Sequence, residues 1–276
     1  MNKLNLSPYT PDRCYESRMT SAKELEYRIL AAVPADEPPA SGYGVIYALD
    51  GDAVFQTLAE TVRMQTRKPK GYDPILVIGI AYPSREPFDM NRRCRDFTMA
   101  VEAASLPERP DGRSWPPHGG AAEFLDFLEQ ELMPAVSERW PIDASRQMLA
   151  GHSLGGLLTL HALFTRQHLF THYAAGSPST WWAENEVLRE LDRFATDWQG
   201  GRPAHVLLTI GADELPDMLE GAEETARRLE PLTGAGLTLD WVAFDGEEHV
   251  SVLPCMLSRL PRFLWSGDGA DRFAEA

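Results

Sequence analysis

The chain has 276 residues, with 41 acidic and 26 basic side chains that give a formal net charge of −15 at pH 7. Hydrophobic residues make up 43% of the sequence and charged residues 24%, which is typical of a globular protein and argues against a largely disordered chain. The excess of negative charge argues against a nucleic-acid-binding protein and against docking on an anionic membrane surface.

The first eighty residues contain four candidate strands and one candidate helix. Residues 14–19 and 25–33 alternate between apolar and polar side chains, which predicts an antiparallel edge to a sheet. Two continuous apolar runs, at 44–49 and 75–81, predict strands that are covered on both faces. An amphipathic helix is expected between these two strands, at 53–64.

Residues 83–119 do not follow this alternation. The segment carries six prolines and has no sustained hydrophobic period. Irregular segments of this length in compact domains are usually lids or binding loops. Because Phe88, Phe97 and Trp115 provide apolar side chains to pack, we expect an irregular lid or binding segment here.

The rest of the chain alternates between helices and strands. The longest helix is expected at 120–140, where Pro134 is expected to kink it or end it early. Further strands are expected at 147–150, 173–176, 205–210 and 237–244, and further helices at 154–166, 185–194, 215–229 and 250–264. Strands joined by crossover helices predict an α/β fold in a single domain spanning 1–276, with a mostly parallel central sheet of about eight strands flanked by helices.

A G-x-S-x-G pentapeptide stands at residues 151–155, with the sequence Gly-His-Ser-Leu-Gly. It follows a short apolar strand and precedes a helix, which is the setting of the nucleophile elbow in α/β-hydrolases. The sharp turn presents the Ser153 hydroxyl at the edge of the sheet, and only small residues fit two positions before and after it. The pattern therefore predicts an α/β-hydrolase fold with Ser153 as its nucleophile.

A serine nucleophile needs a general base, and in this fold the chain order is serine, acid, histidine. His249 follows the last expected strand through an acidic turn and opens the final helix, which is where a catalytic histidine belongs. His152 lies inside the elbow, and we expect its side chain to point away from the Ser153 face. We therefore predict His249 as the base.

The acid that orients the histidine is expected at the end of the strand at 205–210. Asp213 and Glu214 are both candidates there, and Glu214 is favoured. Either residue is also a candidate N-cap for the helix that begins at Leu215.

Two backbone N–H groups are expected to form the oxyanion hole. One belongs to Leu154, directly after the nucleophile. The other is expected from the Asp50-Gly51-Asp52 loop after the strand at 44–49, from Gly51 or Asp52. Asp-Gly is also an ordinary turn dipeptide, but its place at the end of a strand favours the functional interpretation.

Four longer stretches carry a family resemblance. They are the elbow GHSLGGLLTLHALF, the upstream YALDGDAVF, the segment RCRDFT from Arg93, and SPSTWW at 177–182. Together they resemble the siderophore esterases, the trilactone hydrolases that cleave ferric enterobactin-type triscatecholates, within the α/β-hydrolase branch that includes esterase D. The resemblance extends from about Tyr15 to Leu264.

The resemblance implies roles for particular residues. It places the nucleophile at Ser153 and the base at His249, and its G-x-x-E strand end falls at Gly211 and Glu214, which supports Glu214 as the acid.

The resemblance also implies a binding site for the ligand. A substrate-contacting arginine falls at Arg93 and an aromatic wall at Trp181 and Trp182. Arginine offers charge-assisted hydrogen bonds to an anionic triscatecholate, and tryptophan offers an extended apolar face to its rings. The net charge of −15 does not oppose this, because six arginines balance six acidic residues within 83–119 and charges beyond roughly 8 Å are screened at physiological salt.

The expected function is therefore that of a serine esterase that hydrolyses a ferric enterobactin-like catecholate trilactone and releases iron. An esterase D-like carboxylesterase or thioesterase acting on small acyl esters is the alternative, and the serine–acid–histidine order disfavours a binding protein without turnover. We expect no cofactor, no metal, no nucleic-acid partner and no membrane association, and the oligomeric state stays open. Three scattered cysteines form no disulfide framework, and the polar N-terminus resembles no secretory leader, so a cytoplasmic location is expected.

Overall fold

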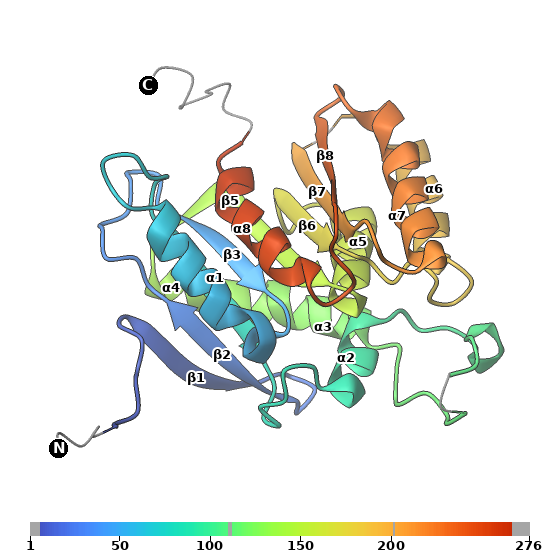
Figure 1. The fold of residues 1–276 in the computed structure, drawn as a ribbon, viewed down its shortest axis with the longest axis horizontal. Coiled ribbons are helices and arrows are strands. Elements are labelled where there is room, and N and C mark those ends of the chain that lie inside the picture. The colour runs from blue at the N-terminus through green and yellow to red at the C-terminus, as the bar shows by residue number, and fades with distance from the viewer. Residues whose placement is uncertain (1–5, 110–111, 201, 267–276) are drawn as a thin grey trace.

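The computed structural model describes residues 6–109, 112–200 and 202–266 and contains one eight-stranded sheet (Figure 1). The strand order across the sheet is β1-β2-β4-β3-β5-β6-β7-β8. In chain order the strands are β1 (Cys14–Thr20), β2 (Glu26–Ala32), β3 (Tyr43–Ala48), β4 (Ile75–Ala81), β5 (Ile142–His152), β6 (His172–Gly176), β7 (Ala204–Gly211) and β8 (Leu237–Phe244). All eight expected strands are confirmed.

The direction of the strands follows their hydrophobic patterns. The alternating strands β1 and β2 pair antiparallel at one edge, and β2 is antiparallel to β4, whereas all other pairs are parallel. Every residue of β3 and β4 is buried, as continuous apolar runs predict for strands covered on both faces. Strand β5 begins at Ile142 rather than at 147. The sequence pattern did not reveal its first half, because that half includes exposed residues and lacks an apolar run.

Helices cover both faces of the sheet. They are α1 (Gly51–Gln65), α2 (Met90–Phe97), α3 (Ala121–Phe127), α4 (Met133–Arg139), α5 (Leu154–Thr165), α6 (Glu186–Asp197), α7 (Pro216–Leu229) and α8 (Val252–Leu264). Helices α1 and α8 lie in front of the sheet in Figure 1, where Leu58 and Leu260 pack in one cluster with Ile46 and Val77. Helices α5 and α6 belong to the larger cluster on the other face. None of the described helices is long and apolar enough to cross a bilayer.

The long helix expected at 120–140 does not end at Pro134. The helical path instead widens into a π-helical turn, Leu128–Leu132, between α3 and α4, and Pro134 lies in the first turn of α4. Proline lacks an N–H group and its ring clashes with the carbonyl of the preceding turn. A wider turn makes room for the ring, so the helix continues to Arg139.

The segment 83–119 is less irregular than expected, because it contains α2 and a short 3₁₀ turn, Ala103–Ser105. Helix α2 begins after Asp89, whose side chain accepts a hydrogen bond from the Arg92 N–H (3.0 Å). Its buried face includes Arg93 and Asp96 beside Phe97, so a hydrophobic period could not reveal it. Residues 110 and 111 of the segment lie outside the described residues. Its role as a lid, and a single domain spanning 1–276, stay predictions.

Candidate active site

Ser153 occupies the turn between β5 and α5. Its backbone has φ 60° and ψ −119°, a conformation that is strained for a residue with a side chain. A Cβ atom on Gly151 would lie 2.3 Å from the Gly155 carbonyl oxygen, and one on Gly156 would lie 2.7 Å from the Gly176 carbonyl oxygen. The tight turn therefore requires glycine at 151, and the close approach of α5 to β6 requires it at 156.

The histidine and one of the two candidate acids meet at the carboxyl ends of β7 and β8. His249 lies in the turn before α8, and its Nδ1 is 2.7 Å from Glu214 Oε2. The His249 side chain is 40% exposed, whereas that of Glu214 is fully buried. With Nδ1 donating its proton to the carboxylate, Nε2 is left as the proton acceptor.

Among the described residues, the second candidate acid, Asp213, forms no ion pair with the histidine. It is exposed, and its backbone N–H donates to the Glu247 carbonyl oxygen (3.0 Å). The structure thus brings Glu214 rather than Asp213 to His249. Neighbouring residues in a turn direct their side chains differently, and only the fold shows which one faces β8.

Three hydrogen bonds keep the Glu214 carboxyl group ionised. Burial by itself raises the pKa of Glu214, but hydrogen bonds from His249, the Ser177 hydroxyl and the Gly211 N–H outweigh burial and hold that pKa below its ordinary value. A carboxylate that stays charged can stabilise an imidazolium formed at His249.

A serine that the sequence analysis did not single out contacts the nucleophile. Ser179 Oγ lies 3.3 Å from Ser153 Oγ, and the Ser179 N–H donates to the Ser153 carbonyl oxygen (3.1 Å). Within the described part of the chain, no hydrogen bond joins Ser153 to His249. Catalytic hydrogen bonds are often long without substrate and tighten when it binds.

The His152 ring lies against the His249 ring. The two rings have centroids 4.6 Å apart. Burial and the neighbouring His249 lower the pKa of His152 to about 3, so its ring is neutral at physiological pH. The neutral His152 ring packs beside the His249 ring, so this contact holds His249 next to the elbow.

The expected oxyanion donors stand at two helix N-termini. Gly51 is the first residue of α1 and Leu154 is the first residue of α5, and the first N–H groups of a helix have no partner within it. The two turns are adjacent, because the Leu49 N–H donates to the Ala150 carbonyl oxygen (2.9 Å). The Asp52 carboxylate is bound by buried Arg28 at 2.7 and 2.9 Å, so its charge is compensated within the protein.

Arg93 does not face solvent, in contrast to the expected substrate contact. Its side chain is only 5% exposed, and Nε donates to Asp50 Oδ1 at 2.9 Å. Its Nη2 donates to the His152 carbonyl oxygen at 3.2 Å. The guanidinium is bound within the protein, which corrects the expected ligand contact. Arg93 instead links the Asp50-Gly51-Asp52 loop, here called the oxyanion loop, to the nucleophile elbow.

The two neighbouring tryptophans also differ from the expected aromatic wall. Trp182 is fully buried in the core, with its ring 5.1 Å from that of Trp115. Trp181 is half-buried, with its ring 6.0 Å from that of Trp115. The burial of Trp182 corrects its expected place in an aromatic wall, whereas Trp181 and Trp115 are partly exposed.

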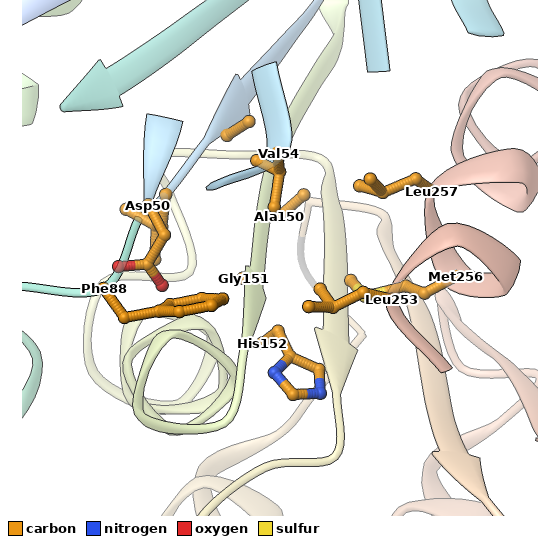
Figure 2. Close-up of a pocket in the computed structure, with 11 residues that line it drawn as sticks. Asp50, Val54, Phe88, Ala150, Gly151, His152, Leu253, Met256 and Leu257 are labelled. Carbon is orange, nitrogen blue, oxygen red and sulfur yellow. The ribbon is translucent and has the colours of Figure 1, made fainter. Parts of the chain in front are cut away.

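A small cavity lies behind the elbow. Figure 2 shows Asp50, Phe88 and His152 on one side of it and Met256 and Leu257 of α8 on the other. Its volume is about 10 Å³, whereas sites for small organic ligands occupy roughly 300–1,000 Å³. The cavity is therefore too small for an ester substrate, and Ser153 does not line it.

Comparisons with known proteins relate the chain to esterases. A family described as "Putative esterase" matches residues 21–230. The chain is 42% identical over 262 residues to the ferri-bacillibactin esterase BesA of Bacillus subtilis, covering 92% of this chain and 90% of that one. It is 33% identical to a siderophore triacetylfusarinine C esterase of Aspergillus fumigatus, covering 78% and 79%. The crystal structure of the BES protein from Bacillus cereus superposes with a TM-score of 0.89 at 36% identity, covering 95% and 99%.

Proposed function

Because the chain belongs to the siderophore esterases within this esterase family, we propose that it hydrolyses the ester bonds of a ferric catecholate trilactone through Ser153. The observation that carries the assignment is Ser153 on a strained elbow, together with a histidine that packs against the neighbouring His152 and whose Nδ1 is bound by a buried carboxylate. This arrangement serves acyl transfer to a serine.

The first half of the reaction forms an acyl-enzyme. Ser153 Oγ attacks the ester carbonyl carbon while its proton passes to His249 Nε2, and Glu214 stabilises the resulting imidazolium. The carbonyl oxygen becomes an oxyanion, which accepts hydrogen bonds from the Leu154 N–H and from an N–H of the Gly51–Asp52 turn. The bond from the carbonyl carbon to the ester oxygen then breaks, and the leaving alcohol takes the proton from His249.

The second half releases the acyl group. A water molecule attacks the acyl carbon and gives its proton to His249 Nε2. The bond to Ser153 Oγ breaks, the serine recovers the proton from His249, and a carboxylic acid leaves. Each turn of the cycle therefore consumes one ester bond and one water, and hydrolysis of the trilactone would weaken its hold on iron.

The esterase D-like alternative is not favoured. Two relatives that cover 92% and 78% of the chain are siderophore esterases. The half-buried rings of Trp115 and Trp181 support a flat aromatic ligand, because they offer apolar surface and Trp181 lies two residues after Ser179, which contacts Ser153. A cytoplasmic location stays a prediction.

The experiment that tests the proposal compares two serine variants. Ser153→Ala is expected to lower hydrolysis of a generic aryl ester and of ferric enterobactin by at least about 10³-fold, with an unchanged fold by circular dichroism. Ser258→Ala, at an exposed position on α8, is the matched control and keeps full activity. Wild-type activity of Ser153→Ala would refute the assignment. Faster turnover of aryl acetate than of ferric enterobactin by the wild type would favour the esterase D-like alternative.

A further inference from the structure

The connection from β6 to α6 begins with the turn Ser177-Pro178-Ser179. None of these three residues takes part in the catalytic cycle described above. Ser177 is fully buried and has φ 40°, a left-handed value that residues with a side chain rarely adopt. Its backbone N–H donates to the Thr209 carbonyl oxygen of β7 (2.7 Å). The turn is thus anchored to β7, the strand that precedes the acid, in a conformation that glycine would adopt more easily.

The Ser177 hydroxyl uses that conformation to reach the acid. Its Oγ donates to Glu214 Oε1, the oxygen that also accepts from the Gly211 N–H at 3.1 Å. The other oxygen, Oε2, accepts from His249 Nδ1 at 2.7 Å. The donors on Oε1 therefore fix the rotation of the carboxyl group and leave Oε2 directed at the histidine.

The other end of the same turn contacts the nucleophile. Ser179 Oγ lies 3.3 Å from Ser153 Oγ, and the Ser179 N–H donates to the Ser153 carbonyl oxygen at 3.1 Å. One three-residue turn thus contacts both the acid and the nucleophile. A change in the turn would alter their relative position.

We propose that Ser177 is a positioning residue, which keeps a strained backbone so that its hydroxyl orients Glu214 toward His249. The proposal rests on the proposed function, because it requires Glu214 to act through His249. Packing in the core does not require a serine at this position. Glycine would relieve the strain of the left-handed φ, and alanine would bury no polar group. The hydroxyl is the feature that neither replacement supplies.

The test uses two variants that both remove the hydroxyl but differ in backbone strain. Ser177→Gly and Ser177→Ala are each expected to lower kcat about 10- to 100-fold, the effect of losing one hydrogen bond to a charged group, with KM unchanged. Ser177→Gly is expected to melt at or above the wild-type temperature, because glycine relieves the left-handed φ. Glu24→Gly is the matched control: Glu24 is exposed, lies away from the site and has φ 59°, so its replacement relieves similar strain with kcat unchanged.

A double-mutant cycle shows whether the hydroxyl acts through the acid. In a Glu214→Gln background, Ser177→Gly is expected to cause no further loss of kcat. The downfield NMR signal of the His249 Nδ1 proton is expected to shift in Ser177→Gly and to stay in place in Glu24→Gly.

Two results would overturn the inference: full kcat in Ser177→Gly, or an equal loss in the wild-type and Glu214→Gln backgrounds. The activity of Ser153→Ala separates this failure from a failure of the proposed function. If Ser153→Ala still hydrolyses the ester, the proposed function fails. If hydrolysis depends on Ser153 while Ser177→Gly is fully active, only the inference on Ser177 fails.

Discussion

Replacing Arg93 with methionine removes a buried cation while keeping most of the length of its side chain. Arg93 bridges Asp50 of the oxyanion loop at 2.9 Å and the carbonyl oxygen of His152, next to the nucleophile, at 3.2 Å. The substitution leaves the Asp50 carboxylate buried without its partner. It also removes the side-chain link between the two turns that bracket the substrate carbonyl.

The expected loss of stability follows from the burial of the pair. The Arg93 and Asp50 side chains are 5% and 2% exposed, so solvent does not screen the charge that remains. Breaking such a buried pair costs about 3–5 kcal/mol. At about 2–4 °C per kcal/mol, the unfolding midpoint is expected to fall by roughly 6–20 °C.

The loss is expected to depend on pH. Burial raises the pKa of Asp50 above its ordinary value of 3.8 even beside Arg93, and removing the arginine raises that pKa further. A carboxyl group with a raised folded-state pKa contributes stability that is present below 3.8 and lost as the pH rises through the folded-state pKa. The stability deficit of Arg93→Met is therefore expected to shrink when the pH is lowered from about 7 toward about 5.

The assay combines calorimetry with steady-state kinetics. Arg93→Met is expected to lower the unfolding midpoint and kcat with little change in KM, and the double variant Arg93→Met/Asp50→Asn is expected to recover part of the stability because no buried charge remains. A wild-type midpoint with a raised KM would refute this reasoning and restore the ligand contact that the family resemblance implies for Arg93.

Three further predictions concern the site and its surroundings. Glu214→Gln is expected to lower kcat by about 10²- to 10⁴-fold, while Asp213→Asn leaves it unchanged because that side chain is exposed; equal losses in kinetic assays would contradict the pairing of Glu214 with His249. Trp181→Ala is expected to raise KM for a ferric triscatecholate about tenfold, whereas Trp182→Ala is expected to lose about 3–5 kcal/mol of stability in chemical denaturation; a raised KM with full stability in Trp182→Ala would show that the buried ring reaches the ligand. The His152 imidazole, with a pKa of about 3, is expected to show no NMR titration above about pH 5; a transition near the ordinary 6.5 would refute its neutral packing.

Local sequence patterns were sufficient to predict those elements whose structure depends on neighbouring residues in the chain. The runs at 75–81 and 237–244 became β4 and β8 with the expected bounds. Strand β4 is buried throughout, as a continuous apolar run predicts, whereas β8 is a partly exposed strand at the edge of the sheet. Helix α2 was missed, since its buried face contains Arg93 and Asp96, which are bound by Asp50 and Tyr27 from distant parts of the chain. Their burial depends on those partners, which a local hydrophobic pattern does not contain.

The nucleophile and the acid show the same division. The strand, turn and helix around Ser153 lie within one short stretch of sequence, so the elbow is a local feature. The choice of Glu214 over Asp213 depends on His249, which lies 35 residues further along the chain. Only the pairing of β7 with β8 brings the turns after these two strands together.

The sequence by itself determined the fold class, the elbow and the identities of the nucleophile and base candidates, because these features follow from hydrophobic period and turn chemistry. The tertiary structure decided what each polar side chain contacts. Arg93 reaches Asp50 across 43 residues, and Ser177 reaches Glu214 across 37. Such pairings result from packing of whole elements, since a buried charge is stable only where the fold supplies its partner.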